Sequence, residues 1–176
     1  MANREALREL QIRLASRLQA ARTEGVSVAW LAVKAGEANY LFPLAQSGEI
    51  FPLAQMQRVP YTRSWFMGVV NLRGGLFGVV DLAGFIAGKA PANRTDQAMA
   101  QASVVTFNTV LDINCALMVD TLAGLRKRDA FEPPVAPPAG SPACFGNLFT
   151  DGQGVQWQEI NLQTLVQSTD FLSISA

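Results

Sequence analysis

Two apolar, β-branched runs joined by a short polar break constrain this chain more than any other feature. The runs cover residues 65–72 and 76–82, and Arg73-Gly74-Gly75 joins them. A Gly-Gly pair adopts positive φ angles without a Cβ penalty, as a tight hairpin turn requires. Because strand side chains alternate and both faces here are largely apolar, the pattern predicts a β-hairpin inside a core.

Asn71 and Arg73 are the polar exceptions in this hairpin. No acidic residue lies near Arg73 in the sequence. Its guanidinium is therefore a solvated turn charge, an internal partner of Glu49, Asp81 or Asp120, or a fork of donors for another protein. The residues alone favour none of these roles over the others.

Short apolar runs broken by turn residues continue along the rest of the chain. Many short strands at close spacing favour a barrel or sandwich over a parallel α/β sheet. Besides the hairpin, strands are expected in the runs Val26–Ala32, Tyr40–Leu44, Ile50–Leu53, Val104–Phe107, Ala116–Val119 and Val155–Ile160.

Residues 3–22 have the spacing of an amphipathic helix. A stripe of apolar residues falls on one face at helical spacing, namely Leu7, Leu10, Leu14, Leu18 and Ala21. We expect this helix to lie across the β core. The alternative is a detachable arm that docks on a partner.

Two stretches have the composition of connectors. Residues 88–102 are polar and Ala-rich, and we expect them to join two β units with room for a helical turn. Residues 131–146 contain five prolines, too many for regular secondary structure. A stiff surface loop is favoured there over a recognition sequence for an SH3 or WW partner.

The amino-acid composition excludes several classes of function for this chain. The chain has 176 residues, 49% of them hydrophobic, which suits one domain or two small β-subdomains. Fourteen basic residues balance fourteen acidic ones, so nucleic acid is not an expected partner. No apolar run approaches the ~20 residues of a membrane span, and the N-terminal residues lack a signal-peptide pattern. We expect a cytoplasmic protein without direct membrane insertion.

The residues of ordinary catalysis are missing from the sequence. There is no histidine, and the acidic residues do not form the clusters that metal or glycosidase chemistry uses. Asp81 and Asp120 lie at strand ends, where a carboxylate usually accepts backbone N–H bonds from the next turn. We therefore expect that the protein is not an enzyme and that it has no catalytic residue, metal or cofactor.

Cys115 and Cys144 are predicted to be buried free thiols. The competing hypothesis is a small-ligand or cysteine-reactive β-barrel. It would require a thiol with a low pKa, and no basic cluster flanks either cysteine.

The hairpin also carries a family resemblance. Residues 68–74, Gly-Val-Val-Asn-Leu-Arg-Gly, followed by Val79-Val80-Asp81-Leu82, resemble the signature of CheW-type chemotaxis coupling proteins. The segments 40–44, 47–50, 117–120 and 159–165 are similar to further family strands in the same order. The N-terminal extension and the diverged second half look most similar to PilI-type coupling proteins of chemosensory systems that control type IV pili.

The resemblance implies a mainly β, CheW-like fold with two packed five-stranded SH3-like β-barrels, an added N-terminal helix and a short C-terminal helix. The expected boundaries are 1–25 for the N-terminal helix and 26–166 for the CheW-like domain, followed by a tail at 167–176. Within the domain, the first barrel covers about 26–87, the connector about 88–102 and the second barrel about 103–166.

The resemblance also implies a function. The chain would be an adaptor between the cytoplasmic tip of a methyl-accepting chemoreceptor and the regulatory domain of a CheA-like histidine kinase, in twitching motility or alternatively in flagellar chemotaxis. The residues expected to bind partners are Glu49, Ile50, Gly68, Asn71, Leu72, Arg73 and Gly74.

Overall fold

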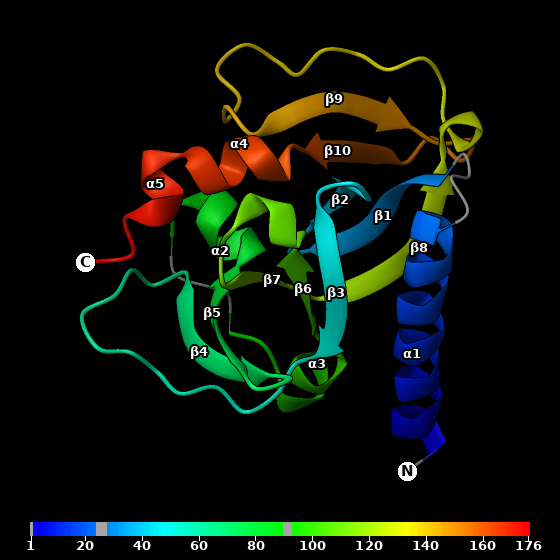
Figure 1. The fold of residues 1–176 in the computed structure, drawn as a ribbon. Coiled ribbons are helices and arrows are strands. Elements are labelled where there is room, and N and C mark those ends of the chain that lie inside the picture. Colours follow the sequence, from blue (N-terminus) through cyan, green and yellow to red (C-terminus); the bar gives the residue numbers. More distant parts are fainter. Residues whose placement is uncertain (1, 24–27, 90–92) are drawn as a thin grey trace.

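The structure is a computed structural model that describes residues 2–23, 28–89 and 93–176. Two five-stranded sheets with helices around them confirm the expected mainly β class (Figure 1). The strands are β1 Val28–Ala35, β2 Ala38–Pro43, β3 Ser47–Pro52, β4 Phe66–Leu72, β5 Gly75–Asp81, β6 Ser103–Phe107, β7 Cys115–Val119, β8 Thr121–Lys127, β9 Phe145–Thr150 and β10 Gln156–Ile160. The helices are α1 Ala2–Thr23, α2 Leu82–Ala87, α3 Asp96–Gln101, α4 Leu162–Gln167 and α5 Thr169–Leu172, with 3-10 turns η1 Thr109–Leu111 and η2 Arg128–Ala130.

Each sheet takes strands from both halves of the chain. Sheet A has the order β8-β1-β2-β10-β9, and sheet B has the order β3-β6-β7-β5-β4. The expected division at 26–87 and 103–166 is therefore not the division between the sheets. The reason is that β3 leaves the sheet of β1 and β2, and β8 crosses back to join that sheet.

The two halves of the chain follow the same path. In each half a hairpin (β1–β2 or β6–β7) is followed by a strand that crosses to the other sheet and by a second hairpin (β4–β5 or β9–β10). Each sheet also contains one parallel pair, β2 with β10 and β5 with β7. The fold thus contains an internal structural repeat that the sequence analysis did not detect.

The expected barrels are open in their backbone hydrogen bonding. Among the described residues, no ladder joins the two edge strands of either sheet, although the packing is consistent with an SH3-like arrangement. Helix α1 packs against β3 and β8, which are edge strands of the two sheets (Figure 1).

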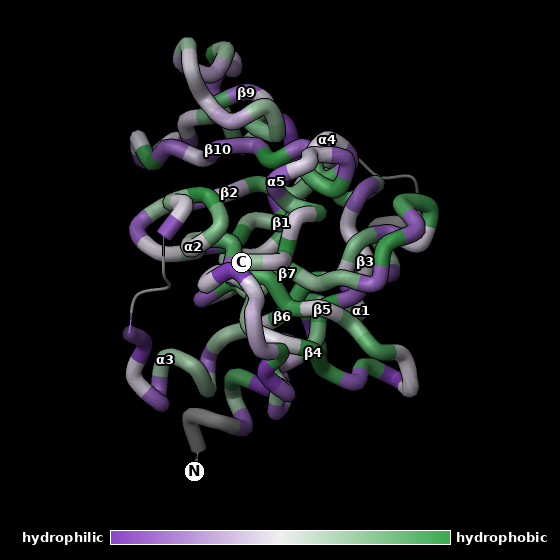
Figure 2. Tube along the Cα trace, turned by 90° about the vertical axis from the view of Figure 1, so that its left-hand side faces the viewer, coloured by the Kyte–Doolittle hydropathy of each residue, from purple (hydrophilic) through white to green (hydrophobic). Residues whose placement is uncertain are grey.

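Alternation along the strands builds a layered core. Leu31 and Val33 of β1 belong to the central cluster between the sheets, whereas Trp30 and Ala32 belong to a separate buried cluster on the opposite face of sheet A. Val79 of β5 lies in a third buried cluster, on the face of sheet B opposite to Val80. The strands are therefore apolar on both faces, as the hairpin pattern predicted. Figure 2 shows hydrophobic residues concentrated in strands at the centre of the molecule.

Helix α1 is an integral part of this core. Leu14 and Leu18 are buried in the central cluster, and the buried Gln11 Nε2 donates to Ser103 Oγ at 2.8 Å. The expected stripe was wrong at Leu10, which is 50% exposed, because the helix is oriented with Gln11 facing the sheet. The side chain of Ala21 and residues 24–25 of the expected N-terminal region lie outside the described part of the chain. Within the described ranges, no helix combines the length and the apolar character needed to cross a bilayer.

The connectors hold more structure than the composition suggested. The helical turn expected in 88–102 is α3, while residues 90–92 lie outside the described ranges. The 131–146 segment is an irregular loop up to Cys144, and strand β9 begins at Phe145. Two isolated bridges, Phe131 with Asp151 and Val135 with Leu148, attach this loop to the β9–β10 hairpin.

The C-terminal tail is also attached to the domain. The expected C-terminal helix is present as two short helices, α4 and α5. After α5, the Arg63 N–H donates to the Ile174 carbonyl at 2.7 Å, and the Ala176 N–H donates to the Tyr61 carbonyl at 3.0 Å. The tail thus orders the long loop that precedes β4.

Candidate functional site

The tip of the β4–β5 hairpin is a two-residue turn. Leu72 pairs with Gly75, and the turn residues are Arg73 with φ 50° and Gly74 with φ 83°. The expectation that Gly74 and Gly75 form the turn was wrong by one residue. A two-residue hairpin loop of this twist requires positive φ at both central positions, so Arg73 adopts a conformation that glycine would otherwise supply.

Asn71 explains how a non-glycine residue is held in this turn. Its Oδ1 accepts a hydrogen bond from the Gly74 N–H at 2.9 Å. Short polar side chains of this type stabilise turns by bonding to nearby backbone groups. Asn71 therefore fixes the loop that presents the Arg73 side chain.

Arg73 joins the two edges of sheet B. Its Nη1 lies 2.8 Å from Glu49 Oε2 on β3, and its guanidinium carbon lies 5.6 Å from the centre of the Phe51 ring. Strands β3 and β4 are the opposite edges of this sheet, and no backbone hydrogen bonds of the described residues join them. The Arg73–Glu49 pair therefore connects the two edges through side chains. Of the internal partners considered for Arg73, Glu49 is the one that the structure selects.

The pair remains accessible from outside. The Arg73 side chain is 74% exposed and the Glu49 side chain 42% exposed. Both residues line a groove of about 350 Å³ that continues over Phe77 and toward Asn108 and Asp112. Such a surface offers a cation, an anion and apolar contacts within one small area.

Four of the other predicted site residues divide into two groups. Gly74 and Asn71 lie at the exposed tip beside Arg73. Ile50 and Leu72 are buried, with 7% and 6% of their surface exposed. Leu72 lines the groove, whereas Ile50 packs in the central cluster.

Gly68 has a backbone role. Its φ is 134°, and a Cβ at this position would collide with the Gln57 carbonyl. Gln57 forms a bridge with Val69, exchanging hydrogen bonds of 2.9 Å in both directions. Gly68 thus lets the preceding loop approach β4 at a point where the β4–β5 register shifts.

Arg94, Asp81 and Asp120 form a buried charge cluster that was not predicted from the sequence. Arg94, in the connector, forms a bidentate pair with Asp81 at 2.9 and 3.0 Å and donates from Nε to Asp120 at 2.6 Å. Asp120 also accepts from the Gly36 N–H at 2.6 Å. The expected bonds to the next turn are therefore not those observed: Asp120 accepts a backbone N–H from the distant Gly36, and Asp81 binds Arg94. No local pattern around Arg94 identifies it as the shared partner.

This cluster connects the two sheets. Asp81 ends β5 in sheet B, and Gly36 lies in the β1–β2 turn of sheet A. Burial on its own lowers the pKa of Arg94, but the hydrogen bonds to Asp81 and Asp120 raise that pKa above its ordinary value. The guanidinium is therefore charged at neutral pH.

Both cysteines are buried free thiols, as predicted. Burial raises the pKa of Cys115 to about 12 and also raises the pKa of Cys144. Because the thiolate is the reactive form, these positions are poorly suited to nucleophilic or redox chemistry. Among the described residues, no group of His, Cys, Asp and Glu side chains could hold a metal ion.

Comparison with known proteins identifies the fold. The profile of the CheW-like domain family matches residues 29–170. The crystal structure of the scaffolding protein TtCheW from Thermoanaerobacter tengcongensis superposes with a TM-score of 0.62 at 16% sequence identity, covering 82% of this chain and 96% of that chain.

A curated relative also matches. Protein PilI of Pseudomonas aeruginosa is 27% identical over 114 residues, which is 65% of this chain and 61% of the relative. The match thus spans about three-fifths of that relative's length. Because the family profile covers most of the sequence, from β1 to α5, this chain belongs to the CheW-like domain family.

Proposed function

We propose that this chain is a non-enzymatic adaptor that couples a methyl-accepting chemoreceptor to a CheA-type histidine kinase. The observation that carries the proposal is the family match across residues 29–170. The similarity to PilI supports a chemosensory system that controls type IV pili and twitching motility. The protein would act in the cytoplasm, recruited to membrane-anchored receptor complexes.

The groove beside Arg73 is the proposed receptor contact. An exposed guanidinium next to a carboxylate can exchange its internal partner for groups on another protein with little loss of fold stability. Glu49, Arg73 and Gly74 would touch the helical tip of the receptor, and Ile50 and Leu72 would hold the groove in shape. Such contacts are modest in area and reversible.

The kinase contact would use the like-folded regulatory domain, packed against one of the two β units. The adaptor then performs no chemistry. It changes the conformational equilibrium of the kinase by binding its states with different affinity.

The test is copurification with the kinase and the receptor of the same organism. Arg73→Glu should weaken receptor capture at least about tenfold, because it removes a charge-assisted contact and places two carboxylates side by side. Arg17→Glu is the control, since Arg17 is an exposed residue of α1 outside the family match. Unchanged capture of both partners by a folded Arg73→Glu protein would contradict the assigned groove.

A charge swap separates direct contact from support. The double variant Glu49→Arg, Arg73→Glu restores an internal ion pair with its polarity reversed. Recovered binding would mean that the pair only shapes the groove, whereas continued loss would place the Arg73 charge in the interface. Deleting the gene and scoring twitching against swimming distinguishes the pilus pathway from flagellar chemotaxis.

A further inference from the structure

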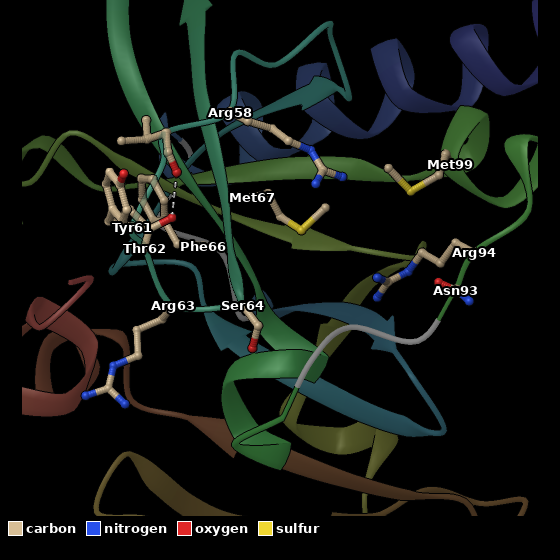
Figure 3. Close-up of a pocket in the computed structure, with 11 residues that line it drawn as sticks. Arg58, Tyr61, Thr62, Arg63, Ser64, Phe66, Met67, Asn93, Arg94 and Met99 are labelled. Atoms are coloured by element: carbon tan, nitrogen blue, oxygen red, sulfur yellow. Dashed lines mark hydrogen bonds between the residues drawn. The ribbon is translucent and has the colours of Figure 1, made fainter. Parts of the chain in front are cut away.

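A second concave surface lies at the other end of β4. It is a pocket of about 490 Å³ between the loop that precedes β4 and the connector that leads into α3 (Figure 3). Strand β4 covers seven residues, so roughly 20 Å of extended chain separates this pocket from the Arg73 turn. Its lining includes Arg58, Arg63, Ser64, Met67, Arg94 and Met99.

The pocket carries positive charge. Three of its lining residues are arginines, and no described lining residue is acidic. Asp81 and Asp120 both pair with Arg94, so the uncompensated positive charge of the pocket is that of Arg58 and Arg63. Arg58 is exposed and forms no ion pair within the described part of the chain.

Arg94 is fixed and still has donors to offer. Its side chain is 9% exposed, and its bonds to Asp81 and Asp120 use three of the five guanidinium N–H groups. The carboxylates thus hold the planar group rigidly at the wall of the pocket. A donor fixed in this way loses little conformational entropy when a ligand binds.

Figure 3 shows how the charged groups are directed. Arg58 and Arg94 extend from opposite walls toward the same space beside Met67 and Met99, whereas Arg63 points away from it. The space thus combines the free guanidinium fork of Arg58 and the two unused N–H groups of Arg94 with two methionine side chains.

We propose that this pocket binds an oxyanion, a carboxylate or phosphate, between Arg58 and Arg94. The free planar fork of Arg58 matches the geometry of both groups, and the unused N–H groups of Arg94 add single donors. The pocket is much larger than one oxyanion, so the group is carried on a larger ligand that also covers the methionines. A small organic acid and an acidic side chain of a partner protein present the same chemistry. The inference does not depend on the proposed adaptor function.

The test is isothermal titration of the full chain in low-salt buffer with three probes: citrate, inorganic phosphate and a synthetic peptide rich in Asp and Glu. Arg58→Ala should weaken binding at least about tenfold, the loss typical of a charge-assisted hydrogen bond. Arg58→Lys should give a smaller loss, since it keeps the charge without the fork. Arg63→Ala is the matched control and should change affinity less than about twofold.

The outcomes separate the sources of the oxyanion. Binding of citrate or phosphate that requires Arg58 supports a small-molecule ligand, and binding of the acidic peptide alone supports a partner side chain. No binding of any probe at millimolar concentration, or equal losses in Arg58→Ala and Arg63→Ala, would overturn the proposal. Arg73→Glu should leave this binding unchanged, so failure of the adaptor proposal would be distinguishable.

Discussion

Replacing Arg94 by Ala should destabilise the fold more than replacing any exposed arginine. Arg94 is 9% exposed and its partner Asp81 is 0% exposed, so the variant leaves a carboxylate in the interior without its cation. Breaking a buried ion pair by removing one partner costs about 3–5 kcal/mol. A domain has about 5–15 kcal/mol in total, so Arg94→Ala should lose a large part of its free energy of unfolding.

The assay is urea unfolding monitored by tryptophan fluorescence. The variants are compared by their urea midpoints, with one m value shared by all of them. Arg73→Ala is the matched control, because it removes the same side chain from an ion pair of similar length, 2.8 Å, that is 74% and 42% exposed. Exposed pairs contribute about 0.2–1 kcal/mol. We expect the Arg94 variant to lose at least threefold more stability than the control.

A second variant tests the cause of the loss. Arg94→Met combined with Asp81→Asn removes both charges, so it should be more stable than Arg94→Ala alone. Equal losses for Arg94→Ala and Arg73→Ala would refute the reasoning, since burial would then have no influence on the strength of the pair.

Three further predictions concern backbone, helix and thiols. Gly68→Ala should cost more than about 3 kcal/mol in urea unfolding, because strain at positive φ adds to a backbone collision, whereas Gly140→Ala, at φ 84° with open space around it, should cost about 1–2 kcal/mol. Leu14→Ala should cost about 2–5 kcal/mol and Leu10→Ala below about 1 kcal/mol if α1 is docked as described; similar small losses would indicate a detachable arm. Cys115 should react with a thiol reagent at pH 8 only after the protein unfolds. Its raised pKa also means that the free energy of unfolding falls as the pH rises from the pKa of an unfolded thiol toward about 12. Rapid reaction of Cys115 in the folded protein would contradict this prediction.

The fold class could be predicted because it depends on local pattern. Alternating apolar residues and turn residues identify the hairpin of β4 and β5 directly. Strand β8 was missed because Thr121–Lys127 is half-exposed and contains Gly124, so its apolar signal is weak. Helix α2 was missed because Leu82–Ala87 continues the apolar run of β5.

The arrangement of the site could not be predicted from the sequence, because it depends on contacts between residues far apart in the chain. Glu49 could only be one of three candidate partners for Arg73, since the choice follows from how sheet B brings β3 to the hairpin tip. Arg94 had no sequence signal, because its two aspartates lie 13 and 26 residues away. The family resemblance contributed the partner classes, which geometry does not specify.

The exchange of strands between the two sheets also constrains how the chain is made. During synthesis, β1 and β2 leave the ribosome long before β8 and β10, with which they pair. Until then the outer edges of the β1–β2 hairpin carry unpaired backbone N–H and C=O groups, a situation that slows folding and favours association with other chains. Neither half should fold when expressed alone, whereas the two halves expressed together could assemble, so a break in the connector is a natural place to build a split reporter.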